Sequence, residues 1–165
     1  MELVAVAAVA ENGVIGRGRS VPWDLPEDRR LYRERVADAP VVVGRRTFES
    51  MRSVGEPPGR RQVVLSRSRS SYPDPGVRVV DGVDAALEAV TDADADADGP
   101  DPVYVLGGEA VYEAFQPRLD RMVLSRVHQS PEGEYRYPEF DRSAWTLERE
   151  ASYDGFTIEF WTRAD

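Results

Sequence analysis

The carboxylate with the strongest claim to a chemical role is Asp28, in the segment Trp23-Asp24-Leu25-Pro26-Glu27-Asp28. It follows an aromatic residue and a leucine, and it stands where a helix would begin. Proline and acids in this order are typical of a first helical turn, where negative charge meets the positive end of the helix dipole. The pattern alone therefore favours a structural acid over a catalytic one, and Asp24 and Glu27 compete for any catalytic role.

Two strand–glycine–helix junctions could bind an anion: Val43-Gly44-Arg45-Arg46-Thr47 and Leu106-Gly107-Gly108. Each predicts a helix N-terminus at the carboxyl end of a strand, where free backbone N–H groups and the helix dipole attract negative charge. Glycine also lets a phosphate approach the backbone closely. Together the junctions suit a pyrophosphate, although either glycine alone could be a simple turn. The strict GxGxxG fingerprint is absent, which argues against an ordinary Rossmann domain.

Basic and hydroxyl side chains follow two neighbouring predicted strands, as Arg45-Arg46 and Ser66-Arg67. An arginine fork matches the geometry of a phosphate, and such groups would favour the 2′-phosphate of NADPH over NADH. The alternative is that these are solvated surface arginines, each paired with one of the abundant acids.

The elements that would position these residues can be predicted from periodicity and from glycine and proline punctuation. We expect helices at 26–36, 47–51, 83–90 and from about residue 110. We expect strands at 3–9, 41–43, 62–66, 77–80, 103–106, 122–127, 145–152 and 156–162. Strands that alternate with helices predict a single α/β domain over residues 1–165, with a mostly parallel central sheet flanked by helices and an antiparallel C-terminal hairpin.

Composition excludes several classes of site. The 165 residues include no cysteine, so disulfides and thiolate metal sites are excluded, and the lone His128 excludes a histidine-cluster metal site. The N-terminal apolar run begins with an acid and is too short to span a bilayer, so we expect a cytoplasmic protein. The aspartate–alanine run at 92–98 predicts an acidic surface loop without the glycine and glutamate of a calcium loop.

The charge balance is strongly acidic: 30 acids face 21 basic residues, for a net charge of -9, and every basic residue is arginine. This charge argues against nucleic acid and anionic membranes as partners. Arginine-rich codon usage with a solubilising surface would explain the balance. We favour life in high salt, where a dense carboxylate shell keeps a protein hydrated and salt screens its self-repulsion.

Six motifs can be compared, in their order and spacing, with those of known protein families. They are Ile15-Gly16, Pro22-Trp23-Asp24-Leu25-Pro26 with Asp28, Val43-Gly44-Arg45 with Thr47-Phe48-Glu49-Ser50, Pro58-Gly59-Arg60, Gly107-Gly108 with Val111-Tyr112, and Glu132-Gly133-Glu134 ahead of Tyr137-Pro138. From residue 3 to about residue 138 the chain thereby resembles the dihydrofolate reductase family. The resemblance implies a monomeric enzyme, inhibited by antifolates, that passes a hydride from NADPH to pterin C6 of dihydrofolate while N5 gains a proton. With the charge balance, it predicts a halophilic archaeal source.

The resemblance also implies roles for substrate-binding residues. Asp28 matches the acid that holds the amino-pyrimidine edge of the pterin, accepting two hydrogen bonds in a fork. Trp23 and Ser125 match residues that place a water beside that acid, and this water would deliver the proton. Arg60 matches the arginine that grips the α-carboxylate of the glutamate tail. The positions that match the lining of the pterin and nicotinamide pocket are Val6, Ala8, Tyr32, Leu106 and Tyr112.

For the cofactor, the resemblance implies contacts from Ala8, Ile15, Gly16, Gly44, Arg45, Arg46, Thr47, Ser66, Arg67, Gly107, Gly108 and Tyr112. It further implies a cis bond between the paired glycines, and a mobile loop at 16–23 that closes over the nicotinamide.

The chain departs from the family pattern at particular positions. Arg29 stands where an apolar residue is usual, and Val21 replaces a methionine at the tip of the loop. Glu109 replaces a small residue, and its carboxylate would repel a pyrophosphate unless it turns away or salt screens it. Two alternatives remain: a riboflavin-pathway reductase of the same fold, which has no glutamate tail for Arg60 to grip, and an inactive NADPH-binding or folate-binding module.

Overall fold

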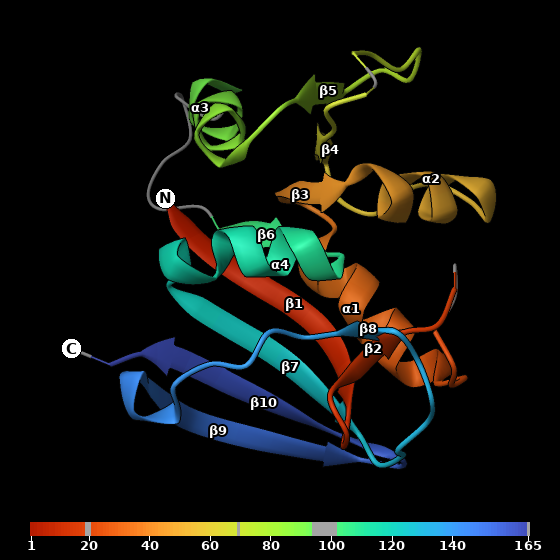
Figure 1. Ribbon diagram of the computed structural model, residues 1–165, viewed down its shortest axis with the longest axis vertical. Coiled ribbons are helices and arrows are strands. Elements are labelled where there is room, and N and C mark those ends of the chain that lie inside the picture. Colours follow the sequence, from red (N-terminus) through yellow and green to blue (C-terminus); the bar gives the residue numbers. More distant parts are fainter. Residues whose placement is uncertain (19–20, 69, 94–101, 165) are drawn as a thin grey trace.

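A computed structural model describes residues 1–18, 21–68, 70–93 and 102–164. Its strands are β1 (Glu2–Ala10), β2 (Val14–Gly16), β3 (Pro40–Gly44), β4 (Arg61–Leu65), β5 (Val77–Val80), β6 (Pro102–Val105), β7 (Arg121–Val127), β8 (Tyr135–Arg136), β9 (Trp145–Tyr153) and β10 (Phe156–Arg163). Eight of them form one sheet in the order β5-β4-β3-β6-β1-β7-β10-β9, and β2 pairs with β8 (Figure 1). Pairing is parallel from β5 to β7, whereas β10 runs antiparallel to both β7 and β9.

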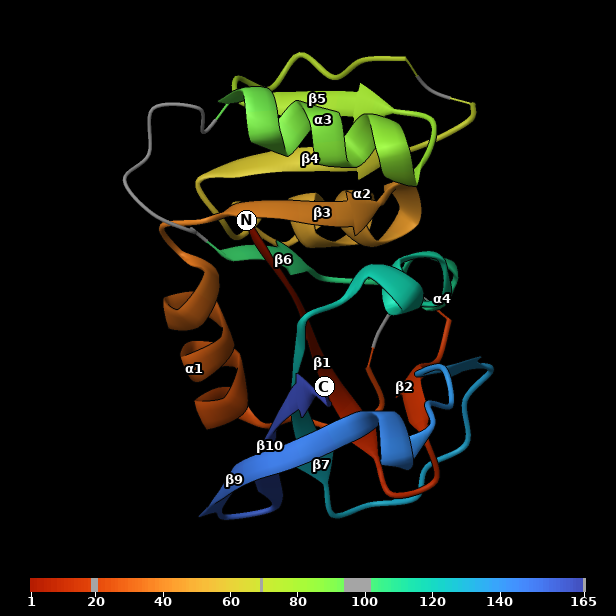
Figure 2. The same ribbon diagram turned by 90° about the vertical axis from the view of Figure 1, so that its left-hand side faces the viewer.

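The helices cover both faces of this sheet. They are α1 (Pro26–Val36), α2 (Arg45–Ser53), α3 (Val83–Ala93) and α4 (Glu109–Phe115), with short 3-10 turns at Gln116–Arg118 and Arg142–Ala144. The buried side chains of α1 and α2 join one core cluster, and those of α3 and α4 join another. In Figure 2, α3 accordingly lies in front of β4 and β5, and α2 lies behind β3.

Strand β1 explains why the core divides in this way. Its sequence is valine and alanine almost throughout, and it is buried along nearly its whole length because helices cover both of its faces. Val4 and Val6 face the cluster beneath α1 and α2, while Ala5 and Ala7 face the cluster beneath α3 and α4. Alternate residues of one strand thus serve two hydrophobic cores.

The predicted α/β fold is confirmed, including its antiparallel C-terminal hairpin. The helix expected at 26–36 has those bounds. Helix α2 begins at residue 45 rather than 47, because Gly44 already takes the N-cap position in extended conformation. Helix α3 continues to Ala93, the second residue of the aspartate–alanine run. Most of the predicted acidic loop, residues 94–101, lies outside the described residues.

Strands β2 and β8 were not expected from the sequence. They are short, and they pair across roughly 120 residues of chain, so neither shows a periodicity of its own. No helix in the described part of the chain is long and apolar enough to cross a membrane.

Candidate active site

The central sheet opens between β1 and β6. The pairing of β1 with β6 extends only as far as Ala5 and Val105, whereas on the other side Leu106 still donates its N–H to Val42 of β3, at 2.9 Å. The next residues of β1 continue to pair with β7 alone. Helix α1 stands on one side of this opening and α4 on the other. In α/β sheets, the carboxyl ends of strands at such a divergence are where ligands bind.

Asp28 lies at this opening, in the first turn of α1, and it is 8% exposed. The hydroxyl of Ser125 donates to its Oδ1 at 2.6 Å. Ser125 pairs with Ala8 in the β1–β7 ladder, so the sheet register fixes the position of the serine along β7. Trp23 is also buried, in a small cluster with Val127 and neighbouring apolar side chains. Of the three residues predicted to be catalytic, the structure therefore joins Asp28 and Ser125 directly, while Trp23 lies in a separate cluster against which Ala8 packs.

Burial dominates the electrostatics of Asp28. Desolvation raises its pKa, and the Ser125 hydrogen bond opposes this shift, as do the positive charges of Arg35 and Arg29. The side chain of Arg29 is itself paired with Asp24, at 2.7 Å. The carboxyl can thus exchange a proton at a higher pH than an exposed aspartate. Arg35 was missed by the sequence analysis, although its position seven residues after Asp28 places it on the same face of α1.

Two tyrosines complete the opening. Tyr112 of α4 reaches across it, and its hydroxyl donates to the Val6 carbonyl oxygen at 2.7 Å. That oxygen lies just past the end of the β1–β6 pairing, so the tyrosine supplies a partner that the sheet does not. Tyr32 follows Asp28 by one helical turn and packs against the cluster that contains Val6 and Leu106. The predicted pocket residues of β1, β6, α1 and α4 therefore adjoin one another.

The two glycine junctions also adjoin. The Gly44 N–H donates to the Gly107 carbonyl oxygen at 2.8 Å, and Thr47 Oγ1 lies 3.2 Å from where a side chain on Gly108 would begin. The Gly107–Gly108 bond is cis, as the resemblance implied. Gly107 has a φ of +107°, and a Cβ atom there would lie 2.9 Å from the Tyr112 ring. Only glycine fits this position without a clash.

The predicted arginines differ in their freedom to bind an anion. Arg45 makes an ion pair with Glu49 of the same helix, at 3.2 Å. Arg46 and Arg67 are exposed, and within the described ranges neither has a carboxylate partner. They follow β3 and β4, whose last residues are level in the sheet. These two guanidinium groups therefore face no competing carboxylate among the described residues, whereas Arg45 does.

Arg60 lies at the far end of α1. It borders a cavity of about 260 Å³ that Arg35, Glu34, Asp38 and Tyr104 also line. Along the axis of α1, Asp28 and Arg35 of this cavity are seven residues apart, which is roughly 10 Å. A ligand with a polar ring at one end and a carboxylate at the other could lie along the helix between them.

The segment at 14–18 is held by the chain around β8. Glu134 Oε1 accepts the Gly18 N–H at 2.6 Å. A Cβ atom on Gly133 would lie 2.5 Å from the Gly16 carbonyl oxygen, so only glycine permits this contact. Ile15 packs against the core on the α4 side. Glu134 belongs to a motif that the sequence analysis quoted, but its contact with Gly18 was not foreseen.

Glu109, the acid after the paired glycines, is engaged elsewhere. Its Oε1 accepts the backbone N–H of Arg136 in β8, at 3.1 Å. This contact holds one oxygen of the carboxylate against the backbone of β8. Val21, the other departure in this region, has 46% of its surface exposed.

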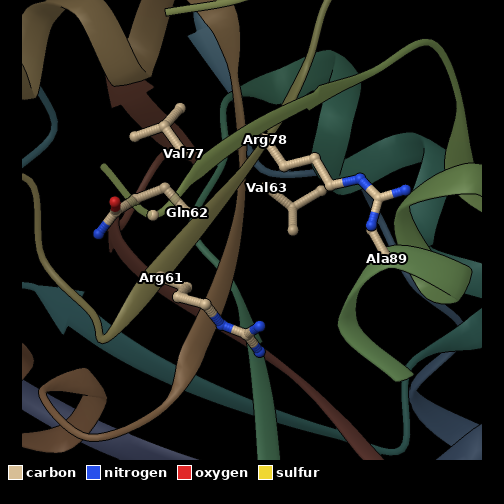
Figure 3. A pocket seen from close by; sticks show the side chains of 7 residues that line it. Arg61, Gln62, Val63, Val77, Arg78 and Ala89 are labelled. Carbon is tan, nitrogen blue, oxygen red and sulfur yellow. The ribbon is translucent and has the colours of Figure 1, made fainter. Parts of the chain in front are cut away.

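A second hollow, of about 220 Å³, lies among Arg61, Gln62, Val63, Gly76, Val77, Arg78 and Ala89 (Figure 3). It borders the first residues of β4 and β5, at the opposite ends of those strands from Ser66 and Arg67. Its position therefore separates it from the predicted cofactor residues.

Comparison with known proteins agrees with this geometry. The family model described as dihydrofolate reductase matches residues 2–160. Dihydrofolate reductase HdrB of Haloferax volcanii is 41% identical over 165 residues, covering 99% of this chain and 84% of the relative. Dihydrofolate reductase 1 of Haloarcula marismortui is 40% identical, covering 95% and 89%. A solved dihydrofolate reductase from Enterococcus faecalis, complexed with NADP(H) and RAB-propyl, superposes with a TM-score of 0.83 at 29% identity, covering 99% of this chain and 97% of its own.

Proposed function

This chain belongs to the dihydrofolate reductase family, and from that premise we propose how its own residues carry out the NADPH-dependent reduction of dihydrofolate to tetrahydrofolate. The observation that carries the proposal is the buried Asp28–Ser125 pair at the opening between β1 and β6. A carboxylate held in one orientation can accept two hydrogen bonds from the amino-pyrimidine edge of a pterin. The match to the dihydrofolate reductase family argues against the alternative function of a riboflavin-pathway reductase.

Asp28 binds and orients the pterin in this proposal. Ser125 uses one lone pair of Oδ1, so both carboxylate oxygens can still accept a hydrogen bond from the substrate. The negative charge of Asp28 favours the protonated pterin at N5, and a water near Trp23 delivers the proton. Val6, Ala8, Leu106 and Tyr112 exclude bulk solvent around the ring. Arg60, at the far end of α1, binds the glutamate carboxylate of the tail.

The residues around the glycine junctions fit NADPH. The backbone of Gly44, Gly107 and Gly108 can approach a pyrophosphate closely, and Thr47 adds a hydroxyl beside Gly108. Arg46 and Arg67 suit the 2′-phosphate, and we place Arg45, Ser66, Ile15 and Gly16 around the remainder of the cofactor. NADPH, when bound, supplies the hydride. The protein contributes the orientation of the two rings, which removes much of the entropic barrier.

The assay that tests the function is oxidation of NADPH with dihydrofolate, followed spectrophotometrically across a KCl series. Turnover that depends on both substrates is the expected result. Binding of both ligands without turnover would instead identify an inactive binding module. Competition by an antifolate locates the reaction at the Asp28 site, because a diamino-pyrimidine ring presents the same hydrogen-bonding edge.

We also propose that residues 1–165 form one domain, which works as a monomer in the cytoplasm of a halophilic organism. The continuous eight-stranded sheet supports a single domain. Edge strand β9 exposes Glu148, Arg149 and Glu150, and such charges discourage edge-to-edge pairing. The relatives from Haloferax and Haloarcula, both halophilic archaea, support the high-salt habitat. Light scattering in molar KCl tests the monomer.

A further inference from the structure

The carboxylate of Glu49 joins two segments that follow neighbouring strands of the sheet. Its Oε2 accepts a hydrogen bond from Nη1 of Arg45, one turn earlier on α2, at 3.2 Å. Its Oε1 accepts from the hydroxyl of Tyr72, in the connection between β4 and β5, at 2.9 Å. Each oxygen is thus tied to a different partner, so the carboxylate is oriented from two sides.

Tyr72 is fixed against α2 by its ring as well as by its hydroxyl. The residue is 8% exposed, and its ring lies edge-on to the fully buried Phe48, with the ring centroids 4.9 Å apart. The guanidinium carbon of Arg52 lies 5.4 Å from the centroid of the Tyr72 ring. Arg52 also pairs with Asp74 of the same connection, at 2.8 Å. These contacts account for the position of the ring, and the hydroxyl adds the bond to Glu49.

Arg45 lies beside both glycine junctions. It is the first residue of α2 and follows Gly44, whose N–H donates to the Gly107 carbonyl oxygen. The side chain of Arg45 is 33% exposed, so a ligand can reach it. Its bond to Glu49 uses one of the five N–H groups of the guanidinium, which leaves donors for an anion.

A carboxylate that was free to turn would compete with a phosphate for this guanidinium. Carboxylates often bind arginine through both oxygens, in two parallel N–H···O bonds. The hydroxyl of Tyr72 keeps Oε1 of Glu49 engaged and so opposes such a pairing with Arg45. The guanidinium is then held in one orientation, and it loses less freedom when a ligand binds.

We propose that Tyr72, acting through Glu49, is a positioning residue that presents the Arg45 guanidinium to a phosphate group of the cofactor. The inference rests on the proposed function, because it takes the ligand of the glycine junctions to be NADPH. Tyr72 and Glu49 orient Arg45 without touching the cofactor themselves. The phosphate group is either the pyrophosphate, which NADH shares, or the 2′-phosphate, which NADH lacks.

The test is Tyr72→Phe, which removes the hydroxyl and keeps the ring against Phe48. By fluorescence titration, we expect NADPH to bind about threefold to tenfold more weakly, as for the loss of one hydrogen bond to a charged group. Dihydrofolate binding should be unchanged. Equal weakening of NADH binding assigns Arg45 to the pyrophosphate, and unchanged NADH binding assigns it to the 2′-phosphate.

A double-mutant cycle with Arg45→Ala separates positioning from a general effect on the fold. If Tyr72 acts through Arg45, Tyr72→Phe should no longer change the NADPH dissociation constant in the Arg45→Ala background. A merely structural tyrosine would weaken NADPH binding to the same extent in both backgrounds.

Tyr153→Phe is the matched control. Tyr153 packs against the same core cluster as Tyr72, with its ring stacked on Phe156, but it lies on edge strand β9. This variant should bind NADPH as the parent does. The proposal is overturned if Tyr72→Phe binds NADPH as tightly as the parent, or if its effect persists in the Arg45→Ala background. A parent that binds NADPH without reducing dihydrofolate contradicts the proposed function, while the titrations still decide the role of Tyr72.

Discussion

Asp28 illustrates how one residue can serve the reaction at the expense of the fold. It is buried, and the raised pKa means that the folded protein holds its proton more tightly than the unfolded chain does. Its contribution to the free energy of unfolding is therefore fully present below the unfolded pKa, near 3.8, and is lost as pH rises through the higher folded value. At neutral pH the ionised carboxylate lowers stability, while the proposed function requires its charge to bind the pterin.

Asp28→Asn should separate these two effects. At pH 7 we expect most activity to be lost, with partial recovery at low pH, where the substrate is already protonated. The melting temperature at pH 7 should rise by about 2 °C or more, since asparagine keeps an acceptor for Ser125 without a buried charge. This gain should disappear below about pH 3.8, where Asp28 is itself protonated. Thermal melts over a pH series measure the change in stability, and turnover rates over the same series measure the loss and recovery of activity.

Asp38→Asn is the control for this prediction, because Asp38 is an exposed aspartate just beyond the other end of α1. Its melting temperature should follow that of the parent at both pH values. Parent-like turnover of Asp28→Asn at pH 7 would show that Asp28 is not the pterin-binding acid.

Arg46 and Arg67 should determine the choice between NADPH and NADH. Both are exposed, and they follow strands that end level with each other. Each charge-assisted contact with a phosphate contributes about 1.5–3 kcal/mol, so the parent should bind NADPH at least tenfold more tightly than NADH. Arg46→Ala and Arg67→Ala should each weaken NADPH binding and leave NADH binding unchanged, as measured by fluorescence titration.

Arg78→Ala provides the comparison, since Arg78 is an exposed arginine in β5 that borders the hollow among the strand beginnings (Figure 3). It should not alter the preference between cofactors. Equal dissociation constants of the parent for NADPH and NADH would show that the protein has no site for the 2′-phosphate.

At the scale of elements, the small β2–β8 pair connects the segment after β1 to the chain that precedes the C-terminal hairpin. Glu134 holds the Gly18 N–H, and Gly133 allows the two backbones to approach. We propose that the segment at 16–23 closes over the nicotinamide, so this contact would stabilise the closed arrangement. Its contribution lies in positioning the segment rather than in touching the reacting atoms.

Glu134→Ala removes the acceptor for the Gly18 N–H and should therefore slow hydride transfer by about threefold to tenfold, because roughly 1 kcal/mol lost from the closed state is about fivefold in rate. The melting temperature should change little, since the contact is exposed. Single-turnover kinetics with a preformed enzyme–NADPH complex isolates the step. Glu132→Ala, at an exposed neighbouring acid, should leave the rate unchanged. Equal rates for both variants would show that the Glu134 contact does not control closure.

Elements with their own periodicity could be predicted from sequence, while contacts between distant segments could not. Helix α1 carries its start signal in Pro26 and the acids that follow, and strand β1 carries a continuous apolar run, so both were found. The β2–β8 pair has too few residues for a pattern. At the site, the family resemblance selected Asp28 and Ser125, but only the fold shows their hydrogen bond across 97 residues of chain. Among the described residues, the Tyr32 hydroxyl oxygen is buried without a hydrogen-bond partner. This feature depends on all of its neighbours at once, so no local pattern could reveal it.

At the scale of the whole molecule, charge is arranged unevenly. The net charge is -9, yet the predicted cofactor and tail sites carry Arg46, Arg67 and Arg60. These basic groups stand in a strongly acidic background, so they can attract an anionic cofactor only at short range. Screening by salt should weaken the repulsion from the rest of the surface more than it weakens contacts at close distance.

The last prediction concerns stability in salt. With 30 acids and 21 arginines, repulsion between like charges should destabilise the compact state when ions are scarce. The screening length falls from roughly 30 Å at 0.01 M to about 3 Å at 1 M ionic strength, so the repulsion fades, and excluded salts also strengthen apolar burial. We therefore expect a melting temperature that rises steadily from low salt into the molar range of KCl, with NADPH binding that does not collapse over the same range. An ordinary acidic protein would level off near physiological ionic strength, where the screening length is already about 8 Å. A plateau by about 0.2 M KCl would reject adaptation to high salt and leave the reductase assignment intact, because the residues at the opening between β1 and β6 act at contact distance whatever the surface charge.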